Sequence, residues 1–203
     1  ARDRDHRWST WHGLVLRRGV QSPRAGVGAG DGDVTREGVT PCVVCAVDPG
    51  YEQSAYVLFD GSRVQAHDLL DNLTMLAYLA TTGVGGDHVV CEHIEGMGMP
   101  VGREVFETIF WTGRFFEAAV NGLSGRGVYR SVHRLSRRAV KLHLCGSARA
   151  KDANIRAALL DRFGGKTTAI GSKATPGPLY GIKTHEWAAL ALAVTWSDTH
   201  AKG

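Results

Sequence analysis

The sequence has few cysteines and lacks a long apolar run. Four cysteines among 203 residues are too few for a disulfide scaffold, so a reducing compartment is the simpler expectation. No stretch approaches the roughly 18–20 consecutive apolar residues that a membrane-spanning helix requires. The first residues also contain no apolar segment of the kind that forms a secretory signal. These absences argue against an integral membrane protein and a disulfide-rich secreted domain, and we expect a cytoplasmic protein.

The composition indicates one globular domain with an N-terminal extension. Hydrophobic residues make up 43% of the chain and charged residues 22%, as in a soluble domain with a core. Residues 1–40 combine the glycine-rich stretch VGAGDGDV with a single short apolar patch, GLVL. So little apolar surface does not offset the entropy that a chain loses on ordering. We therefore expect a disordered extension over 1–40 and a folded domain over 41–203.

The charges are unevenly distributed along the chain. The formal net charge is only +4, but residues 41–125 carry three basic residues against eleven acidic ones. Residues 126–173 carry twelve basic residues against two acidic ones. An acidic segment followed by a basic one suits a metal site beside a surface that binds a polyanion. The alternative is that the basic helices present ordinary solvated faces.

Hydrophobic periodicity predicts an α/β domain with a mixed five-stranded sheet flanked by helices. Strands are indicated by apolar runs or alternating patterns over 39–50, 55–61, 62–68, 88–94 and 127–135. Helices are indicated by helical spacing over 69–80, 102–121, 137–144, 151–165 and 185–196. The first three strands follow one another closely, which is typical of an antiparallel meander.

Two of the predicted helices have a recognisable apolar side. In the helix 69–80 this side is formed by Leu69, Leu73, Leu76 and Leu79. In the helix 102–121 it is formed by Val105, Ile109, Phe116 and Val120. Such a side ordinarily packs on a core. The longer, phenylalanine-rich helix is also a candidate dimer surface.

Two carboxylates stand at positions where strands place functional groups. Asp48 ends the first predicted strand, just before Pro49 and Gly50, where open α/β sheets bind ligands. It is equally compatible with a turn aspartate that bonds its own backbone. Glu92 lies within the apolar strand VVCEHI, where an unpaired charge is costly to desolvate. A pairing partner or a metal ion is the better explanation for Glu92.

The histidine and cysteine patterns are less specific. His185 opens the last predicted helix and is either a solvated helix end or a neutral ligand for a divalent cation. Glu186 is adjacent, about 100° further round the helix, so the two side chains do not point equally well at one ion. Cys42 and Cys45 form a CxxC pattern, but an extended strand turns them to opposite sides. Buried core cysteine is therefore preferred to a zinc site.

Four ordered blocks over about 42–196 resemble one protein family. AVDPGYEQSAYVLFDG resembles the first hairpin of RuvC-type Holliday-junction resolvases, in the RNase H-like superfamily. CEHIEGMGMPVGREVFETIFWTGRF is similar to resolvase-like proteins of tailed bacteriophages. KLHLCGSARAKDANIRAALLDRFGG is similar to their basic stretch and Lys-Asp helix, and PGPLYGIKTHEWAALALAVTW resembles their final helix. The resemblance implies an RNase H-like fold.

The resemblance also implies a set of site residues. The family's catalytic carboxylates fall on Asp48 and Glu92, and its third ligand falls on His185. RuvC-type enzymes usually have a further aspartate three residues later, but this chain has Ala188 there. Either Glu186 substitutes for that acid or the fourth ligand is missing. The implied cofactor is Mg²⁺ or Mn²⁺, as two ions that activate a water and stabilise the leaving oxygen.

The implied activity is metal-dependent cleavage of branched DNA, with phage DNA recombination as its setting. Lys151 is expected to approach the scissile phosphate. DNA phosphates are expected to contact the basic residues Lys141, Arg149, Lys151, Arg137 and Arg138. Two symmetric cuts imply a homodimer by analogy with the family. The alternative is a DNA-binding domain that does not cut, which Ala188 favours. An actin-like ATPase also begins with such a strand, but it needs a second domain and more residues.

Overall fold

The computed structural model describes residues 42–81, 86–96, 98, 100–121 and 131–200. The expected disordered extension over 1–40 lies outside these residues, as does the beginning of the strand predicted over 127–135. No helix within the described part of the chain is both long enough and apolar enough to cross a membrane.

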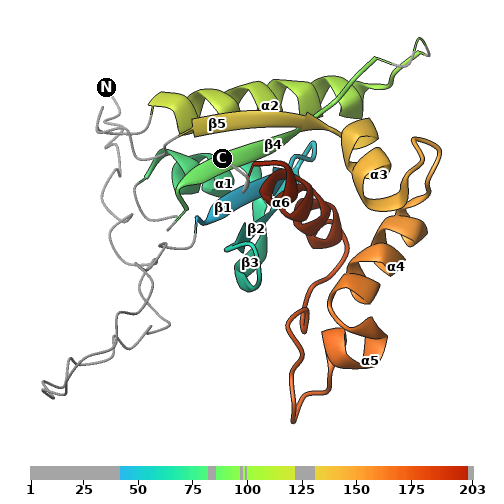
Figure 1. Ribbon diagram of the computed structural model, residues 1–203. Coiled ribbons are helices and arrows are strands. Elements are labelled where there is room, and N and C mark those ends of the chain that lie inside the picture. Colours follow the sequence, from blue (N-terminus) through green and yellow to red (C-terminus); the bar gives the residue numbers. More distant parts are fainter. Residues whose placement is uncertain (1–41, 82–85, 97, 99, 122–130, 201–203) are drawn as a thin grey trace, which may run out of the picture. The chain divides into compact units, whose positions relative to one another are not determined.

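A mixed five-stranded sheet forms the centre of the domain (Figure 1). Its strands are β1 (Val44–Asp48), β2 (Gln53–Phe59), β3 (Val64–Asp71), β4 (His88–His93) and β5 (Ser131–Ser136). Their order across the sheet is β3-β2-β1-β4-β5. The first three strands pair antiparallel, whereas β4 pairs parallel with both β1 and β5. The predicted meander and the predicted mixed sheet are confirmed.

The central strands are apolar because both of their faces are covered. Along β1, Val44 and Ala46 point into one core, while Cys45 and Val47 point into the other. All four side chains are fully buried. This period-two division assigns each side chain of a strand to one of two hydrophobic clusters.

Helices cover both faces of the sheet, and their bounds are α1 (Asn72–Ala80), α2 (Arg103–Asn121), α3 (Arg137–Cys145), α4 (Asp152–Arg162), α5 (Gly165–Ile170) and α6 (Glu186–His200). On one face α1 and α2 pack against the sheet, and on the other α6 does so with α3, α4 and α5 contributing (Figure 1). Helix α6 is apolar on nearly all sides, with Ala189–Val194 all buried. A helix of this kind belongs in the interior, between the sheet and a second layer of helices.

The boundary between β3 and α1 differs from the prediction. Leu69 and Leu70 belong to β3, and α1 begins only at Asn72 because the Asp71 side chain accepts hydrogen bonds from the amides of the first turn. Leu73, predicted to face the core, is 66% exposed. Helix α5 was not predicted, because six residues containing two threonines and a glycine show no helical apolar pattern.

The buried side of α2 also differs from the prediction. The helix buries Thr108, Thr112, Phe115 and Ala119, whereas Ile109 and Val120, predicted to face the core, are exposed. The threonines tolerate burial because their hydroxyls donate to backbone carbonyls four residues earlier in the same helix. An apolar face of α2 consequently stays in contact with solvent.

Candidate active site

Two carboxylates lie side by side on adjacent parallel strands. The register pairs Val47 of β1 with Cys91 of β4, so Asp48 and Glu92 are the next residues along. Both side chains are largely buried, with 14% of each exposed. The parallel pairing brings together two acids that are 44 residues apart in the sequence.

A buried hydrogen-bond network holds the turn that follows Asp48. The Ser54 hydroxyl accepts from the Gly50 amide and donates to the Asn72 side chain at 2.7 Å, and Asn72 donates in turn to the Gly50 carbonyl. A Cβ atom on Gly50 would lie 2.2 Å from the carbonyl oxygen of Gln53. The close approach requires glycine at this position. The network therefore fixes the chain immediately beyond Asp48.

His185 reaches Asp48 from the start of α6. Its Nδ1 lies 3.3 Å from Asp48 Oδ2, and 70% of its side chain is exposed. The preceding residue, Thr184, has a φ of 31°, a conformation that β-branched residues rarely adopt. Local backbone strain of this kind persists where the surrounding structure enforces it. In this chain it occurs at the residue that delivers His185 to the carboxylates.

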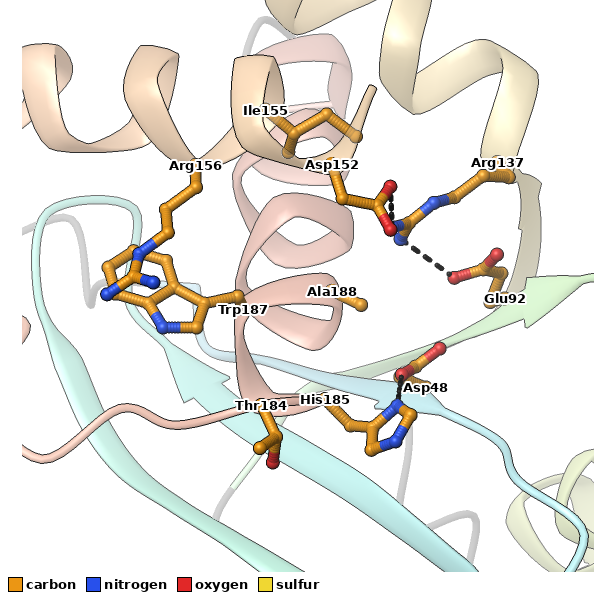
Figure 2. Close-up of a pocket in the computed structure, with 10 residues that line it drawn as sticks. All are labelled: Asp48, Glu92, Arg137, Asp152, Ile155, Arg156, Thr184, His185, Trp187 and Ala188. Atoms are coloured by element: carbon orange, nitrogen blue, oxygen red, sulfur yellow. Dashed lines mark hydrogen bonds and ion pairs between the residues drawn. The ribbon is translucent and has the colours of Figure 1, made fainter. Parts of the chain in front are cut away.

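Arg137 lies among the acids and bridges two of them. Its guanidinium is 3.4 Å from Glu92 Oε2 through Nη1 and 2.7 Å from Asp152 Oδ1 through Nη2. Arg137 begins α3 directly after β5, and Asp152 begins α4. Figure 2 shows the guanidinium between the two carboxylates. The side chain of Arg137 thus joins three elements: α3, α4 and the central strand β4.

The pKa values of Glu92 and His185 are both raised above those of free side chains. Burial raises the pKa of Glu92 to about 8, and the neighbouring Asp48 carboxylate adds to this rise, while Arg137 opposes it. The hydrogen bond to Asp48 raises the pKa of His185 above its ordinary value. The carboxylates therefore favour cations, and at neutral pH Glu92 largely keeps its proton.

These residues line a pocket of about 350 Å³. Its walls come from β1, β4, α3, α4 and the beginning of α6 (Figure 2). Its lining consists of Asp48, Glu92, Arg137, Asp152, Ile155, Arg156, Thr184, His185, Trp187 and Ala188. A concave site with convergent polar groups at the end of parallel strands is typical of ligand binding in open α/β sheets.

The structure does not bring Glu186 into this pocket. Glu186 is 6% exposed, and its carboxylate accepts from His67 on β3 and from the backbone amide of Lys183. The angle of about 100° between neighbouring residues of a helix turns it toward the sheet while His185 faces the pocket. The expectation that Glu186 replaces the acid missing at Ala188 is therefore not supported by the geometry. Ala188 itself lines the pocket.

The residues predicted to bind DNA occupy different environments. Arg137 is engaged in the pocket and is not part of an exposed basic surface. Arg138, Arg149 and Lys151 are exposed, and Lys141 is half-buried. Lys151 is the residue before α4 and does not line the pocket. Its approach to a scissile phosphate stays a prediction.

The cysteines do not form a metal site in the described residues. Cys45 and Cys91 are fully buried, and burial raises the pKa of both thiols, as expected for core cysteines. Cys42, in contrast, is exposed. The interpretation of the CxxC pattern as core is correct for Cys45 and wrong for Cys42, which precedes the first buried residue of β1.

The donor atoms of Asp48, Glu92 and His185 are chemically suited to Mg²⁺ or Mn²⁺. In the positions described here, however, no three side chains of the histidine, cysteine or acid types lie close enough to hold one ion. The positive charge beside Glu92 is supplied instead by Arg137. The residues therefore fit such an ion by type, charge and strand position, and some donor atoms have to move to bind it.

Besides Ala188, whose position the resemblance singled out, five pocket residues were not predicted as site residues, namely Asp152, Ile155, Arg156, Thr184 and Trp187. Asp152 and Arg156 are one helical turn apart, with Ile155 between them and buried. A charged pair at this spacing beside a buried residue is a weak sequence signal, because solvated helices show it often. The pair becomes part of the pocket because α4 packs against α6.

Comparison with known proteins identifies the fold. No family model and no curated protein matches the chain. Among solved structures, RuvC of Thermus thermophilus matches with a TM-score of 0.52 and 15% identity, over 78% of this chain and 96% of that one. T. thermophilus RuvC in complex with a Holliday junction substrate matches with a TM-score of 0.50 and 18% identity, over 76% and 92%. The predicted α/β fold with a mixed five-stranded sheet flanked by helices is confirmed, and it is similar to the fold of these RuvC structures.

Proposed function

We propose that this protein is a divalent-metal-dependent endonuclease that cleaves phosphodiester bonds in branched DNA. The observation that carries the proposal is the meeting of Asp48, Glu92 and His185 in one pocket at the end of β1 and β4. The fold is that of the RuvC structures, one of which is in complex with a Holliday junction. We place the activity in phage DNA recombination or processing in a bacterial cytoplasm, on the resemblance of the sequence to phage proteins.

The chain's own residues prepare the site for an ion and a phosphate. Nδ1 of His185 lies 3.3 Å from Asp48 Oδ2, so Nδ1 faces the carboxylate and Nε2 is the ring nitrogen left to coordinate an ion. Glu92 would hold the ion as a carboxylate, so it would have to give up its proton for an ion to bind. Asp48, Glu92 and His185 would hold Mg²⁺ or Mn²⁺, whose chemistry there would be to polarise the phosphodiester and to lower the pKa of an attacking water.

Cleavage of a labelled four-way junction tests the proposal. The junction and a matched linear duplex are incubated with Mg²⁺, Mn²⁺ or EDTA. We expect metal-dependent, symmetric nicking of the junction, and its loss in Asp48→Asn. Asp161→Asn is the matched control, because Asp161 is an exposed acid near the far end of α4 and outside the pocket. Tight junction binding without cutting under either metal would contradict the enzyme and favour the second function below.

A DNA-binding domain without nuclease activity is the second candidate function. Ala188 favours it, because this methyl group lines the pocket where the resemblance expects a fourth acid. The retained Asp48, Glu92 and His185 argue against it. The cleavage experiment separates the two functions.

We also propose that two copies of the chain associate through α2, since a junction with two-fold symmetry requires two cuts. Several large apolar side chains of α2 are exposed although the helix already packs on the sheet, namely Phe106, Ile109, Phe110 and Val120. Phe106 is 62% exposed and Phe110 57%. Phe106, Ile109 and Phe110 are three and four residues apart and so share one side of the helix, and exposed apolar side chains gathered in this way mark association surfaces.

Sedimentation of the purified protein tests the dimer. We expect a dimer for the wild type and a monomer for Phe106→Glu combined with Phe110→Glu. Leu142→Glu on α3 is the control, because Leu142 is a similarly exposed apolar residue, at 46%, on another helix. If the wild type is a monomer at micromolar concentration, the proposed dimer is wrong, and the nuclease proposal is unaffected.

A further inference from the structure

The pocket contains a second cation, Arg156 on α4, which is held in a different way from Arg137. The Arg156 guanidinium carbon lies 4.6 Å from the centre of the Trp187 ring. Trp187 is 8% exposed at the start of α6, whereas Arg156 is exposed. Figure 2 shows the arginine reaching from α4 over the indole, on the opposite side of the pocket from Glu92. A buried ring from one helix therefore fixes a cation from another at the edge of the site.

Stacking on a ring leaves the hydrogen-bonding capacity of an arginine available. The guanidinium presents its flat face to the aromatic ring, while its N–H groups lie along its edges. Among the described residues no ion pair joins Arg156 to a carboxylate. Its orientation is thus set by packing and not by an acid that a ligand would have to displace.

The other cations of this region are less suited to a ligand. Arg137 already donates to Glu92 and Asp152, and an incoming anion would have to break these bonds. Lys151 does not line the pocket. Arg156 is therefore the cation in the described pocket that combines a fixed position with donors available to an anion.

We propose that Arg156, supported by the Trp187 ring, binds a backbone phosphate of the DNA strand that enters the pocket. This inference rests on the proposed function and names the residue that positions its substrate. The Asp48 and Asp152 carboxylates repel a phosphate, so a cation is needed to bring one close. A planar guanidinium suits this task because it binds phosphate through two parallel hydrogen bonds. Phosphate contacts of this kind position a strand without reading its sequence.

Binding of a fluorescent four-way junction in EDTA tests the inference without depending on cleavage. The affinity is measured by anisotropy at several KCl concentrations for the wild type and Arg156→Gln. We expect roughly tenfold weaker binding for the variant, as for the loss of one charged hydrogen-bonding partner. The slope of log affinity against log salt should fall by about one, as for one lost phosphate contact.

Arg63→Gln is the matched control. It removes the same charge from the turn between β2 and β3, at the opposite end of β2 from the pocket. We expect its affinity and salt slope to stay at wild-type values. Arg156→Lys keeps the charge but not the planar face, so we expect an intermediate affinity with an unchanged slope. Circular dichroism and thermal melting verify that each variant is folded.

The outcomes separate this inference from the proposed function. Equal affinity and slope for the wild type and Arg156→Gln would overturn the role of Arg156 and leave the nuclease proposal standing. Equal losses of affinity in Arg156→Gln and Arg63→Gln would also overturn the role of Arg156. The loss would then reflect the net charge of the protein and not a contact in the pocket. A wild type that binds no junction would overturn both proposals.

Discussion

At the scale of single residues, Glu92 combines burial with a second carboxylate beside it. Its pKa of about 8 lies well above the ordinary value of 4.5 for a glutamate. Between these two pH values, and without metal, Glu92 is protonated in the folded chain. In the unfolded chain it is ionised over the same range. The folded state binds more protons there, so the free energy of unfolding falls as the pH rises from about 4.5 to about 8.

We predict that Glu92→Gln removes this pH dependence. The neutral amide avoids the cost of a buried charge, so the variant should be more stable than the wild type at pH 8 in EDTA, by roughly 2–4 kcal/mol. At pH 4.5 the difference should largely disappear. Urea denaturation at several pH values measures it. Glu117→Gln, an exposed acid of α2, is the control and should behave as the wild type does; a constant difference across the pH range would contradict the prediction.

Gly50 shows how one backbone position supports the site. We predict that Gly50→Ala destabilises the fold by about 1–3 kcal/mol, because the added Cβ meets the Gln53 carbonyl oxygen at 2.2 Å. Gly113→Ala on α2 is the control, since nothing lies within 4 Å of its Cβ position. In a helix that change should stabilise by about 0.5–1 kcal/mol. Urea denaturation of both variants checks the opposite signs.

At the scale of elements, the passage from β3 into α1 depends on one side chain. Asp71 is the last residue of β3, and its carboxylate accepts hydrogen bonds from the amides of Leu73 and Thr74. Hydrogen bonds from Thr74 lower the pKa of Asp71. The cap therefore starts the helix without an intervening loop. It also places Asn72, the first residue of α1, in the network that holds the turn after Asp48.

We predict that Asp71→Ala destabilises the domain by about 1 kcal/mol, which is the typical cost of losing a helix cap. Asp71→Asn should recover most of this loss, because its amide oxygen still accepts from the helix amides. Thermal denaturation at pH 7 measures both variants. An Asn variant as unstable as the Ala variant would show that the charge, and not the cap, is what matters.

At the scale of the whole molecule, the pocket lies where the acidic and the basic parts of the sequence meet. Asp48 and Glu92 come from the acidic part, and Arg137 and Arg156 come from the basic part. The uneven distribution of charge along the chain thus becomes an arrangement of acids beside cations in space. Such an arrangement suits a polyanion that has to approach a cation-binding site.

We predict that Mn²⁺ stabilises the folded protein, because an ion that binds only the folded state raises its stability in proportion to the logarithm of its concentration. The melting temperature should rise by a few degrees at millimolar Mn²⁺ and return to its starting value in EDTA. Asp48→Asn should abolish the rise, whereas Asp161→Asn should keep it. A rise of the same size in both variants would place the ion elsewhere.

Hydrophobic patterns predict most of the strands and helices, and they single out the two strand carboxylates as candidate site residues. Alternating and helical patterns predict β1, β2, β4, α3 and α4 well. The reason is that the buried side of a strand or helix places apolar residues at a regular spacing in the sequence. Asp48 and Glu92 can be singled out because each is an acid at the end of an apolar strand or inside one, where the pattern calls for an apolar residue. The predicted faces of α1 and α2 were wrong in part: Leu79 is buried as predicted, but Leu73, Ile109 and Val120 are exposed. Capping by Asp71 and burial of threonines do not follow apolar periodicity.

The set of side chains that share the pocket follows from tertiary packing and not from any local sequence pattern. It places Arg137 between two acids, leaves Glu186 with His67 outside, and sets Arg156 on Trp187. These contacts join residues 15–119 positions apart, and no local pattern encodes them. The physical reason is that periodicity records whether a side chain is buried, whereas its partners depend on how whole helices pack against the sheet.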